Sequence, residues 1–198
     1  MTQNNYNNRL YGRTRGRSKK KINIKYYNDL LNKFRFKEFN INNSYILDIG
    51  TGYGETTIFL SNNFKNNIVV ACEKYIDGNL NLLKQMQLRD IENIELFPGN
   101  VNDILDENYK KKYFDMVWIF FPDPWPKKKH FKRRLINDDF LKKIYNFMNS
   151  KSRIYIVTDS VSYTYSIIKT IYKNKNLFEW VNQNLLYLCL KDYYYLET

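Results

Sequence analysis

The sequence predicts an α/β fold: a doubly wound, mostly parallel sheet with helices on both faces. Short runs that are apolar on both faces alternate with longer amphipathic stretches, which is how parallel strands buried between two helical layers look in a sequence. A glycine-rich turn follows the first of these runs, and polar residues follow the others. Repeated strand–helix units of this kind build an open parallel sheet.

Five apolar runs are the predicted strands: Tyr45–Ile49, Ile68–Cys72, Ile94–Phe97, Met116–Phe121 and Arg153–Val157. Helical spacing predicts a first helix within residues 22–39 and four more at Glu55–Asn62, Gly78–Leu88, Asp138–Phe147 and Tyr163–Tyr172. Residues 178–195 predict at least one further strand. The chain stops at Thr198 inside a strongly β-prone run, so we expect an incomplete C-terminus for the domain.

A chain of 198 residues with 43% hydrophobic residues suits one globular domain. We expect this domain to span residues 22–198, after a flexible basic arm at residues 1–21 that has almost no aliphatic residues. No stretch approaches the ~20 apolar residues of a membrane span, and no secretory signal is evident. Cys72 and Cys189 match no metal-binding spacing. Two such thiols indicate a reducing, cytoplasmic location and no metal.

The formal net charge is +12, and it is concentrated in two segments. Residues 1–28 hold eight Lys/Arg and residues 127–134 hold six, with no acid in either segment. These fourteen charges leave 12 minus 14, or −2, for the rest of the chain. A lysine-rich codon bias would raise the charge everywhere, so the clustering points to a polyanionic partner such as nucleic acid. A solvated tail is the alternative for the arm.

Residues 46–54, ILDIGTGYG, predict a ligand-binding turn between the first strand and its helix. Gly50, Gly52 and Gly54 allow the backbone to turn sharply and approach a ligand closely, and the helix N-terminus offers free N–H groups. Their spacing is not the G-x-G-x-x-G form of dinucleotide-binding proteins. Asp48 precedes the glycines at the strand end, a position that suits a ligand with an ammonium group.

The next two strand ends add polar side chains at the same predicted edge. Glu73 ends the second strand in ACEKY, where an acid accepts hydrogen bonds from ribose hydroxyls. Asn100 follows the third strand in LFPGN, and its amide would suit an adenine ring. Ligands of open α/β sheets bind at this carboxyl edge.

The fourth strand leads into FFPDPWPKKKHFKRR, residues 120–134, which is the most informative segment of the chain. Asp123 lies between two prolines that restrict the backbone, and Trp125 follows it. Six Lys/Arg come next within residues 127–134, which we call the cationic run. The segment therefore predicts a carboxylate at the mouth of a site, beside a surface for phosphates.

With these residues the chain resembles the bacterial tRNA (guanine-N7)-methyltransferases, which use S-adenosylmethionine on a guanine in the tRNA variable loop, position 46 in tRNA numbering. The resemblance extends over most of the chain. It includes YGRTRGR (11–17), LDIGTGYGET, ACEKY, FFPDPWPKKKHFKRRL and IYIVTD with Tyr163. The segment after the fourth strand is specific to that family, whereas the glycine turn is common to many methyltransferases. The resemblance implies a Rossmann-like class I fold.

The resemblance also implies site residues. The cofactor ligands fall on Asp48, the turn glycines, Glu73, Asn100 and Asp123, and the catalytic or guanine-binding acid is Asp123. The tRNA contacts fall on Lys127, Lys129, His130, Phe131, Lys132, Arg133, Arg134 and Asp159, and Thr198 would begin the closing substrate motif.

Three positions depart from the family's pattern. Position 48 is often Glu there, and Asp reaches less far. Position 100 is usually Asp, and Asn loses the charge. Only Thr198 of the closing motif is present.

Other functions agree less well with these residues. An amino-group methyltransferase also places an acid or Asn, prolines and an aromatic residue after this strand, but the cationic run favours tRNA. An RNA-binding module without turnover would account for Asn100 and the missing closing motif. A nicotinamide dehydrogenase has different glycine spacing. Guanine N7 is already a lone-pair acceptor, so Asp123 would orient the base and no residue would need to remove a proton.

Overall fold

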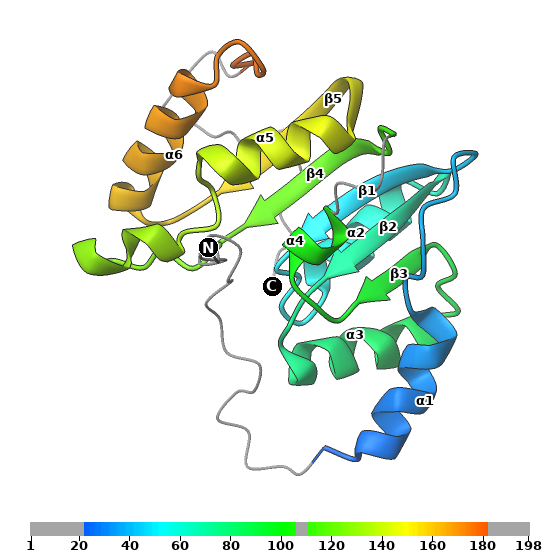
Figure 1. Cartoon of the computed structure of the whole chain (residues 1–198). Coiled ribbons are helices and arrows are strands. Elements are labelled where there is room, and N and C mark those ends of the chain that lie inside the picture. The colour runs from blue at the N-terminus through cyan, green and yellow to red at the C-terminus, as the bar shows by residue number, and fades with distance from the viewer. Residues whose placement is uncertain (1–21, 106–110, 182–198) are drawn as a thin grey trace, which may run out of the picture.

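The computed structural model describes residues 22–105 and 111–181. They form a five-stranded parallel sheet in the order β3-β2-β1-β4-β5 (Figure 1). The strands are β1 (Ser44–Ile49), β2 (Asn67–Cys72), β3 (Ile94–Phe97), β4 (Phe114–Phe120) and β5 (Met148–Val157). The doubly wound parallel sheet predicted from the sequence is confirmed.

Helices connect the strands and cover both faces of the sheet. They are α1 (Ile24–Phe34), α2 (Glu55–Asn63), α3 (Ile76–Leu88), α4 (Val101–Ile104), α5 (Asp138–Phe147) and α6 (Val161–Lys173), with a 3₁₀ helix η1 (Lys128–Arg133). The short helices α4 and η1 were not predicted, since one turn of helix has no apolar periodicity.

Strand residues alternate between two apolar cores, one on each face of the sheet. Ile46 and Val69 pack against the layer of α1, α2 and α3. Their chain neighbours Leu47 and Val70 pack against α4, α5 and α6. All four side chains are fully buried. Burial of an aliphatic side chain stabilises the fold by roughly 1.5–3 kcal/mol, so the two cores fix the sheet between its helices.

The first helix is shorter than the predicted range of residues 22–39. Asn23 caps its start by accepting a hydrogen bond from the Tyr26 N–H. The helix ends at Phe34 because the chain then runs beside β3, where the Phe36 N–H donates to the Leu96 carbonyl at 2.9 Å. An extended segment therefore replaces the last turn of the predicted helix.

Some predictions fall outside the described residues: the arm at 1–21, Thr198 and most of the strand expected within 178–195. The described residues 178–181 belong to neither a helix nor a strand. No helix in the described ranges is long and apolar enough to cross a membrane.

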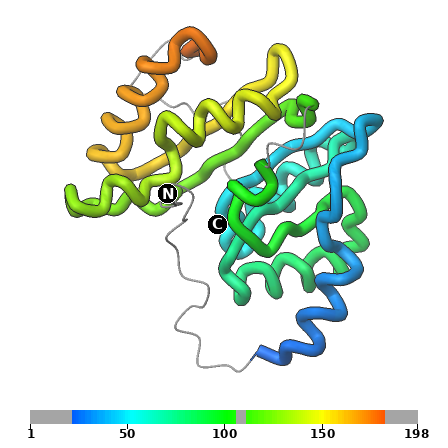
Figure 2. The backbone as a smooth tube through the Cα atoms, viewed as in Figure 1, coloured from blue at the N-terminus to red at the C-terminus, as the bar shows by residue number. Residues whose placement is uncertain are grey.

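The chain order places a crevice at the middle of the sheet. Strands β1 to β3 form one half and β4 and β5 form the other; in Figure 2 the chain runs from blue to green through the first half and on to yellow through the second. The connections therefore run in opposite directions from β1 and β4, which are paired in parallel. Ligands of such sheets bind at the carboxyl ends of these two strands.

Candidate active site

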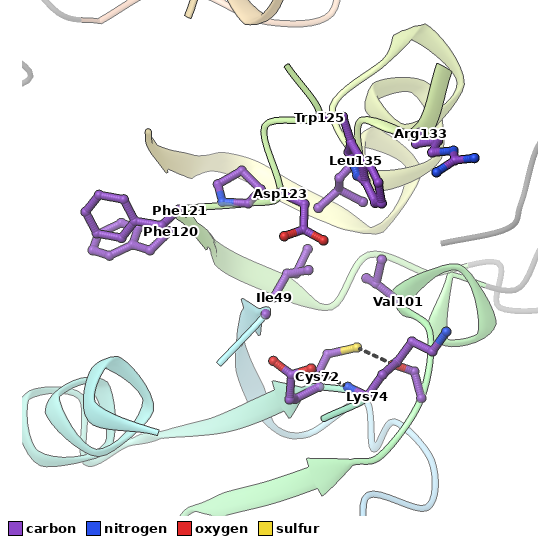
Figure 3. Close-up of a pocket in the computed structure, with 14 residues that line it drawn as sticks. Ile49, Cys72, Lys74, Val101, Phe120, Phe121, Asp123, Trp125, Arg133 and Leu135 are labelled. Atoms are coloured by element: carbon purple, nitrogen blue, oxygen red, sulfur yellow. Dashed lines mark hydrogen bonds between the residues drawn. The ribbon is translucent and has the colours of Figure 1, made fainter. Parts of the chain in front are cut away.

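A cavity of about 270 Å³ opens at the carboxyl edge of the sheet, where β1, β2 and β4 end. Its lining combines backbone from the strand ends, two acids, two cations and aromatic rings. The lining residues are Ile49, Gly50, Cys72, Glu73, Lys74, Gly99, Val101, Phe120, Phe121, Pro122, Asp123, Trp125, Arg133 and Leu135. In Figure 3 the carboxylate of Asp123 points into this space from the β4 side, opposite Cys72 and Lys74.

The glycine turn, residues 50–54, has the backbone conformation that the sequence predicted. Gly50, Gly52 and Gly54 have φ angles of 78°, 56° and 94°, in the left-handed region that other residues seldom adopt. Gly54 also packs on Leu82 of α3, since a Cβ there would lie 2.7 Å from the Leu82 Cδ1 atom. The backbone conformation alone therefore favours glycine at these three positions.

Glu73 joins the end of β2 to this turn. Its Oε2 accepts the Gly52 N–H at 3.0 Å, and its Oε1 accepts the N–H groups of Lys74 at 2.6 Å and Tyr75 at 2.8 Å. A carboxylate has about four lone-pair sites, so these three donors leave one on Oε2. Glu73 can accept one ligand hydroxyl as it lies, and a second only by releasing a backbone donor.

Asp48 lies beneath the turn and does not line the cavity. The residue is only 1% exposed, and its carboxylate accepts the Thr57 hydroxyl of α2 at 2.7 Å. Burial raises the pKa of Asp48 to about 7; the Thr57 hydrogen bond opposes this shift, and the nearby charge of Glu73 adds to it. The side-chain hydrogen bond of Asp48 therefore joins β1 to α2.

Asn100 caps the short helix α4. Its side-chain oxygen accepts the Asn102 N–H at 2.9 Å. Its neighbours Gly99 and Val101 line the cavity, whereas Asn100 does not. The residue therefore reaches the predicted edge of the sheet, where its side-chain oxygen binds the backbone of α4.

Asp123 lies in a strained turn at the end of β4. Residues 121–125, which we call the aspartate turn, begin at Phe121 with φ of 48° and end at Trp125 with φ of 42°. A non-glycine residue in this region costs of order 1–3 kcal/mol and persists only where its surroundings fix it. Asp123 itself is exposed and lines the cavity. Strain of this kind is concentrated at functional sites.

The cationic run folds back beside the aspartate turn as η1. Lys127, Lys128, Lys129 and Lys132 are exposed, as is Phe131. The guanidinium of Arg133 lies 5.0 Å from the centre of the Trp125 ring, and His130 meets the same ring edge-on at 5.7 Å. Partial burial and then the charges of Arg133, Lys129 and Lys127 lower the pKa of His130. The run is thus anchored on Trp125 and presents lysines to solvent.

Arg134 differs from the rest of the run because it is only 3% exposed. Its Nε–H donates to the Pro124 carbonyl at 2.8 Å, and its Nη groups donate to the carbonyl and hydroxyl of Ser162 at 3.1 Å and 3.0 Å. Its guanidinium also lies over the rings of Phe131 and Tyr163, at 3.8 Å and 4.8 Å from their centres. Neither this burial nor these partners were foreseen from the sequence.

The cavity thus unites Gly50, Glu73, Asp123 and Arg133 of the predicted residues. Asp159 lies exposed on the loop after β5. Lys74 and Cys72 line the cavity and were missed because the glycine-turn pattern extends only to the acid at position 73. In the part of the chain that the structure describes, no three His, Cys, Asp or Glu side chains are grouped as metal ligands.

Comparison with known proteins assigns the chain to a family. A family model described as "Putative methyltransferase" matches residues 42–189. The chain belongs to this family. A tRNA (guanine-N(7)-)-methyltransferase of Buchnera aphidicola is 33% identical over 150 residues, which are 76% of this chain and 62% of that protein. A protein of the same name from Neorickettsia sennetsu is 30% identical over 167 residues, 82% of this chain and 74% of that protein. The chain therefore spans about three fifths to three quarters of these methyltransferases.

Solved methyltransferase structures share the fold. The precorrin-6y C5,15-methyltransferase of Geobacter metallireducens aligns with a TM-score of 0.53 and 16% identity, over 80% of this chain and 75% of its own. A SAM-dependent O-methyltransferase of Thermotoga maritima aligns with a TM-score of 0.51 and 15% identity, over 79% and 52%. At this identity the likeness supports the Rossmann-like class I fold.

Proposed function

We propose that this chain transfers a methyl group from S-adenosyl-L-methionine to N7 of a guanine in tRNA, at position 46 of the variable loop, in the cytoplasm. The main support is the place of Asp123. Its side chain lines a cavity that also contains Gly50 of the glycine turn and Glu73, and the exposed lysines of the cationic run begin four residues after it. The relatives named as tRNA (guanine-N(7)-)-methyltransferases support the substrate.

The glycine turn suits the cofactor. Glu73 retains one lone pair for a ribose hydroxyl, and the left-handed glycines leave room for close approach. Thr51 Oγ1 is buried and has no hydrogen-bond partner in the described residues. An unsatisfied buried hydroxyl costs about 1–3 kcal/mol, which a polar ligand at the turn would recover. When bound, the cofactor supplies a methyl group on a sulfonium.

Asp123 would orient the guanine. Its carboxylate can accept hydrogen bonds from N1–H and the exocyclic amine, and this leaves N7 directed toward the methyl donor. N7 is a lone-pair acceptor, so no side chain has to remove a proton. The rate gain would come mainly from proximity and alignment, where an error of 1 Å costs about 100-fold. A rigid, strained turn is suited to that task.

The exposed lysines of the run would bind tRNA phosphates while the base enters the cavity. Lys127, Lys129 and Lys132 lie on one short segment directly after the aspartate turn. Each phosphate contact releases counterions, so affinity should fall steeply with salt. Trp125 connects the cationic run to the cavity: it lines the cavity and contacts Arg133 and His130 of η1.

The decisive experiment incubates the chain with unmodified tRNA and labelled S-adenosylmethionine, then identifies the modified nucleoside and its position. Wild-type protein should produce N7-methylguanine. Asp123→Asn should lower the rate about 100-fold or more, because its amide would present a donor where guanine also donates. Asp139→Asn, which removes one exposed charge on α5, is the matched control.

Other products would overturn the proposal. Methylation of an exocyclic amine would assign the chain to the amino-group methyltransferases. Binding of tRNA without any binding of S-adenosylmethionine by calorimetry would favour an RNA-binding module. Full activity of Asp123→Asn would exclude the orienting role.

A further inference from the structure

Arg134 is the last residue of the cationic run, but its surroundings are those of an interior residue. The lysines before it are exposed, whereas Arg134 is 3% exposed. Its three hydrogen bonds all end on Pro124 and Ser162. Because it is buried, this guanidinium would have to move away from these partners and from the rings of Phe131 and Tyr163 to reach a phosphate at the surface.

These hydrogen bonds connect the aspartate turn to α6. The Pro124 carbonyl belongs to the residue between Asp123 and Trp125, and Ser162 lies in the first turn of α6. The guanidinium is planar and its donors form a fixed fork, so it can bind both groups in one defined geometry. The bonds therefore fix the distance between the end of the turn and the helix.

The turn needs such a support because its backbone is strained at both ends. At its start, the Phe121 N–H donates to the Val157 carbonyl at 2.8 Å, which continues the pairing of β4 with β5. At its far end, the Pro124 carbonyl accepts from Arg134 directly before Trp125, whose φ is 42°. Strained residues persist where neighbouring structure fixes them, and these two bonds bracket Asp123.

We propose that Arg134 is a positioning residue, which fixes the aspartate turn against α6 and so sets the direction of the Asp123 carboxylate. This proposal rests on the proposed function for its activity readout. It separates the run into two parts: exposed lysines for phosphates and a buried arginine for the geometry of the site.

The test compares Arg134→Lys, which keeps the charge and loses the fork, with Lys132→Gln, which removes an exposed charge two residues earlier. Arg134→Lys should lower the single-turnover methylation rate of bound tRNA about 10- to 100-fold. Its tRNA affinity and salt slope should stay within about twofold of wild type. Lys132→Gln should instead weaken tRNA binding and reduce the salt slope by about 1. Lys142→Gln, exposed on α5, is the control.

Two further measurements distinguish positioning from simple loss of stability. Methylguanidinium added to Arg134→Ala should restore part of the rate, because the ligand can occupy the vacated space. Ser162→Ala removes one hydroxyl from an exposed residue and should slow the reaction about threefold with an unchanged melting temperature. If the Arg134 variants do not fold, an unchanged rate in Ser162→Ala overturns the proposal.

A readout without catalysis separates this proposal from the proposed function. In a Trp180→Phe background, Trp118 is buried and Trp125 is the accessible tryptophan. Arg134→Lys should increase acrylamide quenching of Trp125, even if wild-type protein methylates no tRNA. The inference is wrong if quenching and rate both match wild type, or if Arg134→Lys changes the salt slope as Lys132→Gln does.

Discussion

At the scale of single residues, identity and environment together decide what a charged group does. Asp48 and Asp123 both lie near the carboxyl end of a strand, yet one is 1% exposed and the other is exposed at the cavity. Arg133 and Arg134 are neighbours, and only the second is buried. The sequence indicated all four residues as site residues, but Asp123 and Arg133 line the cavity, whereas Asp48 and Arg134 are buried against the scaffold.

Asp48 gives a pH prediction for stability. Its pKa is about 7 in the folded protein, chiefly through burial, and an unfolded aspartate has a pKa of about 4. The folded state therefore binds the proton more tightly, so this group stabilises the fold at low pH and the benefit is lost as pH rises from about 4 to about 7. Three pKa units set an upper limit of about 4 kcal/mol.

Asp48→Asn keeps an acceptor for Thr57 and stays neutral at every pH. Its free energy of unfolding should exceed that of wild type at pH 8, and the difference should shrink toward pH 5. Urea denaturation at the two pH values measures this, with Asp139→Asn as an exposed control. Parallel pH curves for Asp48→Asn and wild type would contradict the proposed ionisation.

At the scale of elements, apolar periodicity predicted the strands and long helices to within a few residues. This periodicity could not predict the places where tertiary contacts move the ends of an element. Helix α1 stops early because Phe36 pairs with Leu96, and β5 begins at Met148, five residues before the predicted start. The carboxyl edge could be predicted because strand ends meet there in any parallel sheet. The fold-back of η1 onto Trp125 could not, because it depends on contacts between side chains.

Gly78 shows how a residue of one element can determine the packing of another. It lies in the first turn of α3, and a Cβ there would lie 2.0 Å from the Gly52 carbonyl oxygen. The sequence offered one signal, a glycine inside a helical pattern, where alanine is normally about 1 kcal/mol more stable. The glycine permits close contact between the helix and the glycine turn.

Gly78→Ala should therefore destabilise the protein despite its higher helix propensity, and it should weaken S-adenosylmethionine binding about tenfold or more by displacing Gly52. Thermal melting and calorimetry measure the two effects. Gln87→Ala, at an exposed position of the same helix, should leave both values unchanged. Tight cofactor binding by Gly78→Ala would show that the turn can move without loss.

At the scale of the whole molecule, the positive charge is concentrated in two segments of the chain. The two basic segments account for more than the net +12, so the remaining chain is slightly acidic. The structure locates one segment, at the mouth of the cavity on η1. The other includes residues 1–21, which lie outside the described residues.

Removal of residues 1–21 tests whether the first segment binds the same partner. These residues include seven of the Lys/Arg, and each phosphate contact contributes about 0.7–0.9 to the slope of log affinity against log salt. The shortened chain should bind tRNA with a shallower slope and keep its affinity for S-adenosylmethionine, because the cavity is lined by residues 49–135. Titrations of tRNA at several salt concentrations, beside calorimetry with the cofactor, measure both. An unchanged slope would mean that the arm does not contact tRNA.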